Sequence, residues 1–458
     1  MNPFYSGKSS VAGRRPLGDR KRTRRSRLYA AALVGVSASC IGLLSVSANA
    51  SGAAGLSGTL TIQSLNFIGP QTTAVVNGFE KQYPNVHVVV STLTNQQFNT
   101  NLVVLTSKNP PDVGWVDINR TLYPQLVKAH QLVPLTSVWS AENLQKRYGP
   151  SYTNAVMQGQ KVPYVVFIDT VYYNTIIYNQ DLFAKLGIPV PSNHRFSSLA
   201  ELTSAIAKLK AAGYAGIAFG ADNTYACADL ISGLLPTSAS PSQLTNYLSN
   251  FNSTVPVTAR YPDAAFLNVL RTIQGYNAKG FFQNGFLGMS DAQAQNVFLL
   301  GKAGMELPDS TLPSTPSFKT NWALLPPVNP GRISQIDTFS DSIGIPANAK
   351  HIALAEKFLE YYVSKQGQEA VAAAHSDLAV VNDVPLSAYG TGLPSTELSM
   401  ITDAKTNGLQ PGWTFIVPGP ISGDADNPLV QEMFLGKETP LQIAQSTQAA
   451  LLQYRKSS

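Results

Sequence analysis

Two hydrophobic periods alternate along this chain. Runs with the two-residue period of strands, or with their β-branched and aromatic content, cover residues 59–64, 86–91, 162–170, 171–178 and 216–219. Apolar residues at helical spacing lie between these runs. The alternation predicts an α/β protein whose mixed sheets are flanked by helices.

Residues 178–220 show this alternation most fully. A short helix follows a strand and ends at Gly187. A second helix is capped by Ser197 or Ser198, ends at Gly213 and leads directly into another strand. We therefore expect a strand–helix–helix–strand unit here.

Two more helices are predicted towards the end of the chain. Residues 353–363 carry apolar side chains on one helical face, and residues 439–454 start with the N-terminal signal Thr439-Pro440. The chain contains no internal repeat and no long low-complexity segment.

Residues 1–50 read as an export signal rather than as part of the fold. Nine Lys and Arg residues precede an apolar run, and Ala48-Asn49-Ala50 offers a signal-peptidase site, so we expect cleavage after Ala50. An uncleaved anchor and a lipid anchor at Cys40 are the less favoured alternatives. Arg24-Arg25 suggests twin-arginine export, but Arg27 departs from that motif, so the export route stays open.

Removing this signal changes the charge of the chain. The full sequence has 33 basic and 27 acidic residues. The signal holds nine of the bases and one acid, which leaves 24 and 26 and a net charge of −2. The mature chain therefore gives no electrostatic case for nucleic acid or an anionic membrane. Cys227 is its only cysteine, which excludes an intramolecular disulfide.

Four phrases, in order, resemble the bacterial extracellular solute-binding proteins of ABC importers, specifically the carbohydrate-binding family that includes maltose-binding protein. They are FEKQYPNVHVVV (79–90), PPDVGW (110–115), YNQDLFAKLGIPVP (178–191) and LGKAGM (300–305). The resemblance implies a type II periplasmic-binding-protein fold with two lobes, each a mixed sheet flanked by helices. Its implied boundaries are 57–167 plus 338–380 for the N-terminal lobe and 168–337 plus 381–458 for the C-terminal lobe.

The same resemblance implies a function. We expect an exported, monomeric receptor that binds a sugar or oligosaccharide between its lobes and closes over it. It would deliver the ligand to ABC permease transmembrane subunits, at the outer face of the cytoplasmic membrane or in the periplasm. No cofactor, metal or catalytic residue is expected.

A sugar site needs aromatic rings for stacking and planar polar groups for paired hydrogen bonds. The resemblance places such residues in loops at the cleft, with the register near Trp115 uncertain by one or two positions. The candidate ligand-binding residues are Asn66, Trp115, Asp117, Asn119, Arg120, Asp169, Asp222, Asn223, Asp309, Asp341 and Trp413. Core packing is the alternative for both tryptophans, and Asp309 stands where several relatives stack a ring.

Other chemistry finds less support. The five histidines are scattered, and no metal-like Cys/His cluster, G-x-S-x-G elbow or phosphate loop is present. Tyr172-Tyr173 invites comparison with ferric-ion receptors, but core packing is the favoured interpretation. Two alternatives stay open: a secreted glycan hydrolase, and a receptor of the same fold for iron, a polyamine or a phosphodiester.

Overall fold

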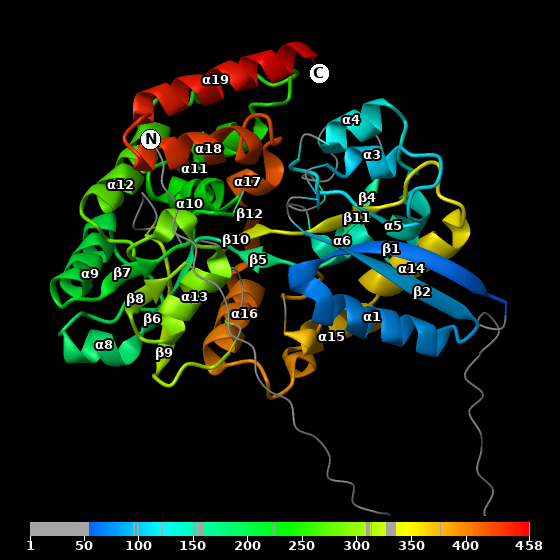
Figure 1. The fold of residues 1–458 in the computed structure, drawn as a ribbon, viewed down its shortest axis with the longest axis horizontal. Coiled ribbons are helices and arrows are strands. Elements are labelled where there is room, and N and C mark those ends of the chain that lie inside the picture. The colour runs from blue at the N-terminus through cyan, green and yellow to red at the C-terminus, as the bar shows by residue number, and fades with distance from the viewer. Residues whose placement is uncertain are drawn as a thin grey trace, which may run out of the picture. The chain divides into compact units, whose positions relative to one another are not determined.

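The computed structural model describes residues 55–457 except 95–96, 99, 121, 150–152, 154–159, 161, 224, 308–311, 313, 327–335 and 376. The predicted export signal and its cleavage site lie outside the described residues. Residues 51–458 form one compact unit (Figure 1). In the part of the chain that the structure describes, no helix is both long and apolar enough to span a bilayer.

The strands belong to sheets that draw on distant parts of the chain. Their bounds are β1 Gly58–Leu65, β2 Val86–Leu93, β3 Gly114–Trp115, β4 Val165–Phe167, β5 Val171–Tyr172, β6 Thr175–Asn179, β7 Ala215–Ala218, β8 Ala303–Glu306, β9 Thr320–Leu324, β10 Ile336–Phe339, β11 Ser342–Gly344 and β12 Leu409–Pro411.

The helices of four residues or more flank these sheets. Their bounds are α1 Gly69–Gln82, α3 Leu102–Leu105, α4 Leu122–Lys128, α5 Thr136–Ala141, α6 Leu144–Tyr148, α8 Gln180–Lys185, α9 Leu199–Ala211, α10 Ala226–Leu234, α11 Pro241–Ser249, α12 Ala264–Ala278, α13 Asp291–Leu299, α14 Ile352–Val363, α15 Lys365–Ala374, α16 Ser395–Asn407, α17 Trp413–Ile416, α18 Gly423–Phe434 and α19 Pro440–Ser457.

The first sheet has the strand order β3-β11-β4 and is extended by the two-stranded sheet β1-β2 beside β3. Strands β1 and β2 are parallel, a parallel bridge from Ile62 to Val113 joins β1 to the start of β3, and β11 runs antiparallel to β3 and β4. The second sheet has the order β7-β8-β6-β9. A third, β12-β10-β5, lies between them (Figure 1).

The segment 162–178 departs from its prediction. Instead of two long strands it forms three short ones, because the chain changes partners twice. Strand β4 pairs with β11, β5 with β10, and β6 with β8 and β9. This segment therefore links all three sheets, and the breaks between its strands put Asp169 and Tyr173 at turning points.

The helix predicted between a Ser197 or Ser198 cap and Gly213 is confirmed as α9, and the helix predicted over 353–363 is confirmed as α14. Ser198 caps α9 by accepting a hydrogen bond from the Glu201 amide, and Gly213 has the positive φ that ends such a helix (+88°). The predicted apolar face of α14 is buried, with Phe358 and Leu359 fully inaccessible.

Candidate functional site

One wall of the candidate site lies at an edge of the first sheet. Because β11 runs antiparallel to β3 and β4, its amino end meets their carboxyl ends. Asp341 therefore comes to lie beside the segments that hold Asp117 and Asp169. The amide of Ser342 donates to Asp117 Oδ1 over 3.1 Å, and the amide of Asp341 donates to Asp169 Oδ1 over 3.1 Å. Main-chain donors thus hold two of these carboxylates in place.

The opposite wall comes from helix α10. Tyr225 stands at its N-cap and Asp229 one turn later, a spacing that puts both side chains on one helical face. Asn223 Nδ2 donates to the Tyr225 hydroxyl over 2.7 Å, which helps to fix the orientation of the ring. A carboxylate in the first turn is also favoured by the helix dipole.

A cavity with about 690 Å³ of empty space, partly open to solvent, separates these walls. Its lining combines aromatic rings with polar and acidic groups. It consists of Leu65, Phe98, Asp117, Asn119, Arg120, Val171, Tyr173, Tyr225, Ala228, Asp229, Phe339, Asp341, Asp377, Thr414 and Gly423.

A second cavity, with about 600 Å³ of empty space, continues into the half that contains β7 and β8. The two cavities share Tyr173, Tyr225 and Asp229. The second one adds two carboxylates, Asp291 and Glu306, and an apolar floor. The two cavities therefore adjoin each other at these three shared side chains.

Burial and neighbouring groups shift the pKa of Asp117 in the first cavity. Burial raises the pKa of Asp117 to about 6 against the opposing attraction of Arg120 and the Ser342 amide. The Arg120 guanidinium carbon lies 5.6 Å from the centre of the Phe98 ring. A carboxylate, a guanidinium and an aromatic face therefore adjoin one another on this wall.

Asn119 connects the two walls. Its Nδ2 donates to the carbonyl of Thr414 over 2.7 Å, and α17, which holds Thr414, packs against α10 and α11. Its Oδ1 is buried and accepts no hydrogen bond from any described residue. Asn119 therefore lies at the cavity with its amide nitrogen fixed to the opposite wall.

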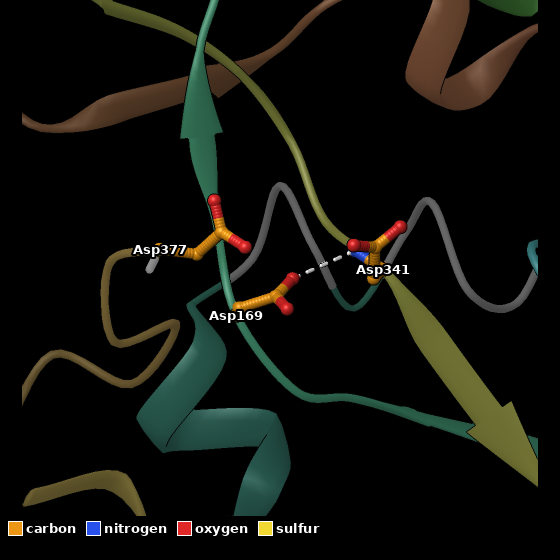
Figure 2. Close-up of side chains that lie close together, drawn as sticks. All are labelled: Asp169, Asp341 and Asp377. Atoms are coloured by element: carbon orange, nitrogen blue, oxygen red, sulfur yellow. Dashed lines mark hydrogen bonds between the residues drawn. The ribbon is translucent and has the colours of Figure 1, made fainter. Parts of the chain in front are cut away.

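Three of the aspartates form one buried cluster. Single carboxylate oxygens of Asp169, Asp341 and Asp377 all lie within 4.8 Å of one another (Figure 2). Gln71 Nε2 also donates to Asp169 Oδ2 over 2.9 Å. Asp341 and Asp377 face the cavity, while Asp169 lies behind them.

Four of the predicted site residues line the first cavity: Asp117, Asn119, Arg120 and Asp341. Trp115 and Trp413 line neither cavity and are only 1% exposed. Trp413 packs against Tyr261 and Phe266 and donates its indole hydrogen to the Tyr261 hydroxyl. Core packing therefore describes both tryptophans, and neither offers a stacking face.

The remaining predicted residues have separate positions. Asn66 and Asp222 are exposed and lie outside both linings, and Asn223 supports Tyr225 rather than facing the space itself. Asp309 lies outside the described residues, so its prediction stays as it was.

Most of the aromatic lining was not predicted from the sequence. Phe98, Tyr173, Tyr225 and Phe339 supply it, and Asp229 and Asp377 add charge. Tyr172 is buried, as expected, but its neighbour Tyr173 points to the opposite side and reaches both cavities. Strand alternation at Tyr172-Tyr173 was the one sequence signal for this face.

Residues 68–369 match the family described as bacterial extracellular solute-binding protein. The chain belongs to this family, since the match covers most of its length. A search of curated protein sequences finds no match.

Solved structures show the same fold at low sequence identity. A protein studied for xylan utilisation by Caldanaerobius polysaccharolyticus is 20% identical, with a TM-score of 0.70 over 86% of this chain and 99% of the other. A chitin oligosaccharide binding protein is 18% identical, with a TM-score of 0.70 over 87% and 99%.

A sugar transporter of Bacillus licheniformis, solved with stachyose, is 15% identical, with a TM-score of 0.65 over 88% of this chain and 100% of the other. The protein therefore has the two-lobed type II fold of periplasmic binding proteins, as predicted.

Proposed function

We propose that this protein is the extracellular substrate-binding component of an ABC importer and that it binds a sugar or oligosaccharide between its lobes. One observation carries the proposal: a single cavity takes aromatic rings and planar polar groups from both walls, which is what a sugar needs. The sugars named for the solved structures agree with this ligand class.

The proposed binding residues are those of the two walls. Asp117, Asn119 and Arg120 would form paired hydrogen bonds with hydroxyls, and Tyr173 and Tyr225 would stack on the C–H face of a ring. We keep the lobe boundaries as proposals: 57–167 plus 338–380, and 168–337 plus 381–458.

Ligand contacts from both walls favour a closed state, because only in that state are all of them made. The closed protein would dock on permease transmembrane subunits, and a separate subunit would supply ATP hydrolysis. Export fits the extracellular family, and the mature chain would begin at Ser51.

Calorimetry with a panel of mono- and oligosaccharides tests this proposal. We expect micromolar or tighter affinity for at least one member and recovery of the ligand unchanged by mass spectrometry. Cleavage of a bound glycan would instead indicate a secreted glycan hydrolase, which is one of the alternatives that the sequence leaves open. Failure of every sugar would overturn the proposal.

A further inference from the structure

Helix α10 carries Tyr225 and Asp229 to both cavities, and its amino end is capped from another part of the chain. The first amides of a helix have no partner within the helix and need an acceptor from elsewhere. Tyr225 stands at the N-cap, but its side chain accepts no hydrogen bond from the described residues of the helix. Cys227, two positions later, is fully buried, so its amide needs an acceptor within the protein.

Asn427, on α18, supplies that acceptor. Helix α18 packs against α10 (Figure 1), and Asn427 Oδ1 accepts a hydrogen bond from the Cys227 amide over 2.8 Å. The other end of the same side chain, Nδ2, donates to the Asn223 carbonyl over 3.3 Å. Asn427 is only 3% exposed, so water competes poorly for either bond. One amide side chain therefore fixes the main chain on both sides of Tyr225.

A second amide side chain on α18 holds the start of the loop that joins β7 to α10. Gln431 lies one turn after Asn427, and its Nε2 donates to the Ala221 carbonyl. Residues four apart share one face of a helix, so the two amide groups are presented to the loop together. The loop begins at Phe219, which lines the second cavity, and ends at Tyr225, which lines both. Helix α18 thus supports a segment that forms part of each cavity.

The contacts continue from the main chain to the aromatic ring. Asn223, whose carbonyl accepts from Asn427, donates through its own Nδ2 to the Tyr225 hydroxyl. The Asp291 amide donates to Asn223 Oδ1 over 3.4 Å, so both ends of this side chain are held. A binding group keeps a precise orientation when the residues that support it are themselves locked by hydrogen bonds. Asn427 is the buried anchor of this chain of contacts.

We propose that Asn427 is a positioning residue for sugar binding. Through Asn223 and the first turn of α10, it holds Tyr225 in the orientation in which the ring stacks on the ligand. Gln431 assists by fixing the start of the loop. The inference rests on the proposed sugar-binding function and goes beyond it, because neither Asn427 nor Gln431 is among the residues that line the two cavities.

Cys227 provides a readout that needs no ligand. It is the only cysteine of the mature chain and is fully buried, and burial raises the pKa of its thiol, so a thiol reagent reacts with it only when the start of α10 opens. Asn427→Ala removes both anchoring bonds. We expect the labelling rate of Cys227 in the folded mature protein to rise at least about tenfold. Calorimetry with stachyose and with a chitin oligosaccharide should show about tenfold weaker binding of whichever sugar the wild type binds.

Asn179→Ala is the matched control. Asn179 is also 3% exposed, and its Oδ1 likewise accepts from an amide in the first turn of a helix, that of Leu182 in α8. Helix α8 contributes no residue to the lining of either cavity. The control should lose a similar amount of overall stability and keep both the labelling rate and the sugar affinity within about threefold of wild type. Changes in Asn427→Ala no larger than those in this control would overturn the inference.

The remaining outcomes also decide the matter. Faster labelling of Asn427→Ala with unchanged sugar affinity would show that the cap serves stability alone, which overturns the positioning role. If Asn427→Ala does not fold, Gln431→Ala tests the same loop from a half-buried position, with an expected rise in labelling of about threefold or more. Unchanged labelling in that variant would overturn the inference. Failure of the wild-type protein to bind any sugar would instead overturn the proposed function, whatever the labelling rates.

Discussion

At the scale of single residues, Tyr225 is the aromatic side chain that we expect to stack on the ligand. It lines both cavities, and Asn223 holds its hydroxyl. Replacing it with alanine should weaken the affinity for the bound sugar about ten- to a hundredfold, because the stacking face is lost. Calorimetry on the Tyr225→Ala variant measures this.

Tyr225→Phe is the matched control, since it keeps the ring and removes only the hydroxyl. We expect its affinity to stay within about threefold of wild type. A loss as large as that of the alanine variant would show that the hydroxyl, rather than the ring, carries the contact.

Asp426 should make the stability of the protein depend on pH. It is fully buried and accepts a 2.6 Å bond from the Thr447 hydroxyl, while its Oδ2 has no partner among described residues. Burial raises its pKa well above the ordinary value. The folded state then binds a proton that the unfolded state has released, so stability falls as pH rises above about 4.

Asp426→Asn removes the free-energy cost of keeping a carboxyl group protonated and buried at neutral pH. The free energy of unfolding should increase by about 1–3 kcal/mol at neutral pH and change little near pH 4. Denaturant unfolding at both pH values checks the prediction. A variant less stable than wild type at neutral pH would contradict it.

Asp112 should affect the pH dependence of stability in the opposite direction to Asp426, and Asp112→Asn tests this. Burial alone would raise the pKa of Asp112, but hydrogen bonds from Thr61 and His351 lower it overall. This carboxylate therefore stabilises the fold above its ordinary pKa, and the contribution is lost as pH falls. The variant should be destabilised at neutral pH and approach wild type under acid conditions.

At the scale of elements, local signals explain which parts of the fold the sequence predicts. A cap and a terminating glycine set the bounds of α9, and an apolar face indicates α14; each signal is contained in a few consecutive residues. The breaks between β4, β5 and β6 depend on partners more than 100 residues away, such as β10 and β11. No local pattern carries that information.

The candidate site was likewise predicted from the sequence only in part. Asp117, Asn119 and Arg120 were predicted because a resemblance placed their loop at the cleft. Trp115, two residues before Asp117, points instead into the core, and a sequence does not reveal which face of β3 meets the cavity. The rings that do line the space come from separate elements, which only tertiary structure brings together.

The close approach of α10 to Tyr173 depends on Gly233. A Cβ added there would lie 2.7 Å from the Tyr173 carbonyl oxygen, a main-chain atom that cannot move aside cheaply. Gly233→Ala should therefore destabilise the protein by about 1–3 kcal/mol and weaken ligand binding, since α10 carries Tyr225 and Asp229. Unfolding curves and calorimetry measure the two effects.

Gly275→Ala is the matched control within α12. A Cβ there meets no atom within 4 Å, so the higher helix propensity of alanine should stabilise the protein by up to about 1 kcal/mol. A Gly233→Ala variant that is as stable as this control would contradict the packing argument.

At the scale of the whole molecule, the bond from Asn119 to the Thr414 carbonyl joins the two walls of the cavity. Asn119→Ala removes this bond and a polar side chain of the cavity wall, so we expect at least a tenfold loss of affinity. Asn348→Ala is the control, because its Nδ2 also donates to a main-chain carbonyl, that of Ser107, on the surface away from the cavity. Equal ligand affinities of the Asn119→Ala and Asn348→Ala variants would exclude a role in binding for the hydrogen bond between Asn119 and Thr414.

Small-angle scattering of the mature chain, with and without a saturating sugar, tests the central claim most directly. If ligand is held by contacts from both lobes, the radius of gyration should decrease on saturation, and the Asn119→Ala variant should require more ligand for the same decrease. An unchanged radius of gyration at proven saturation would contradict closure of the two lobes over their ligand.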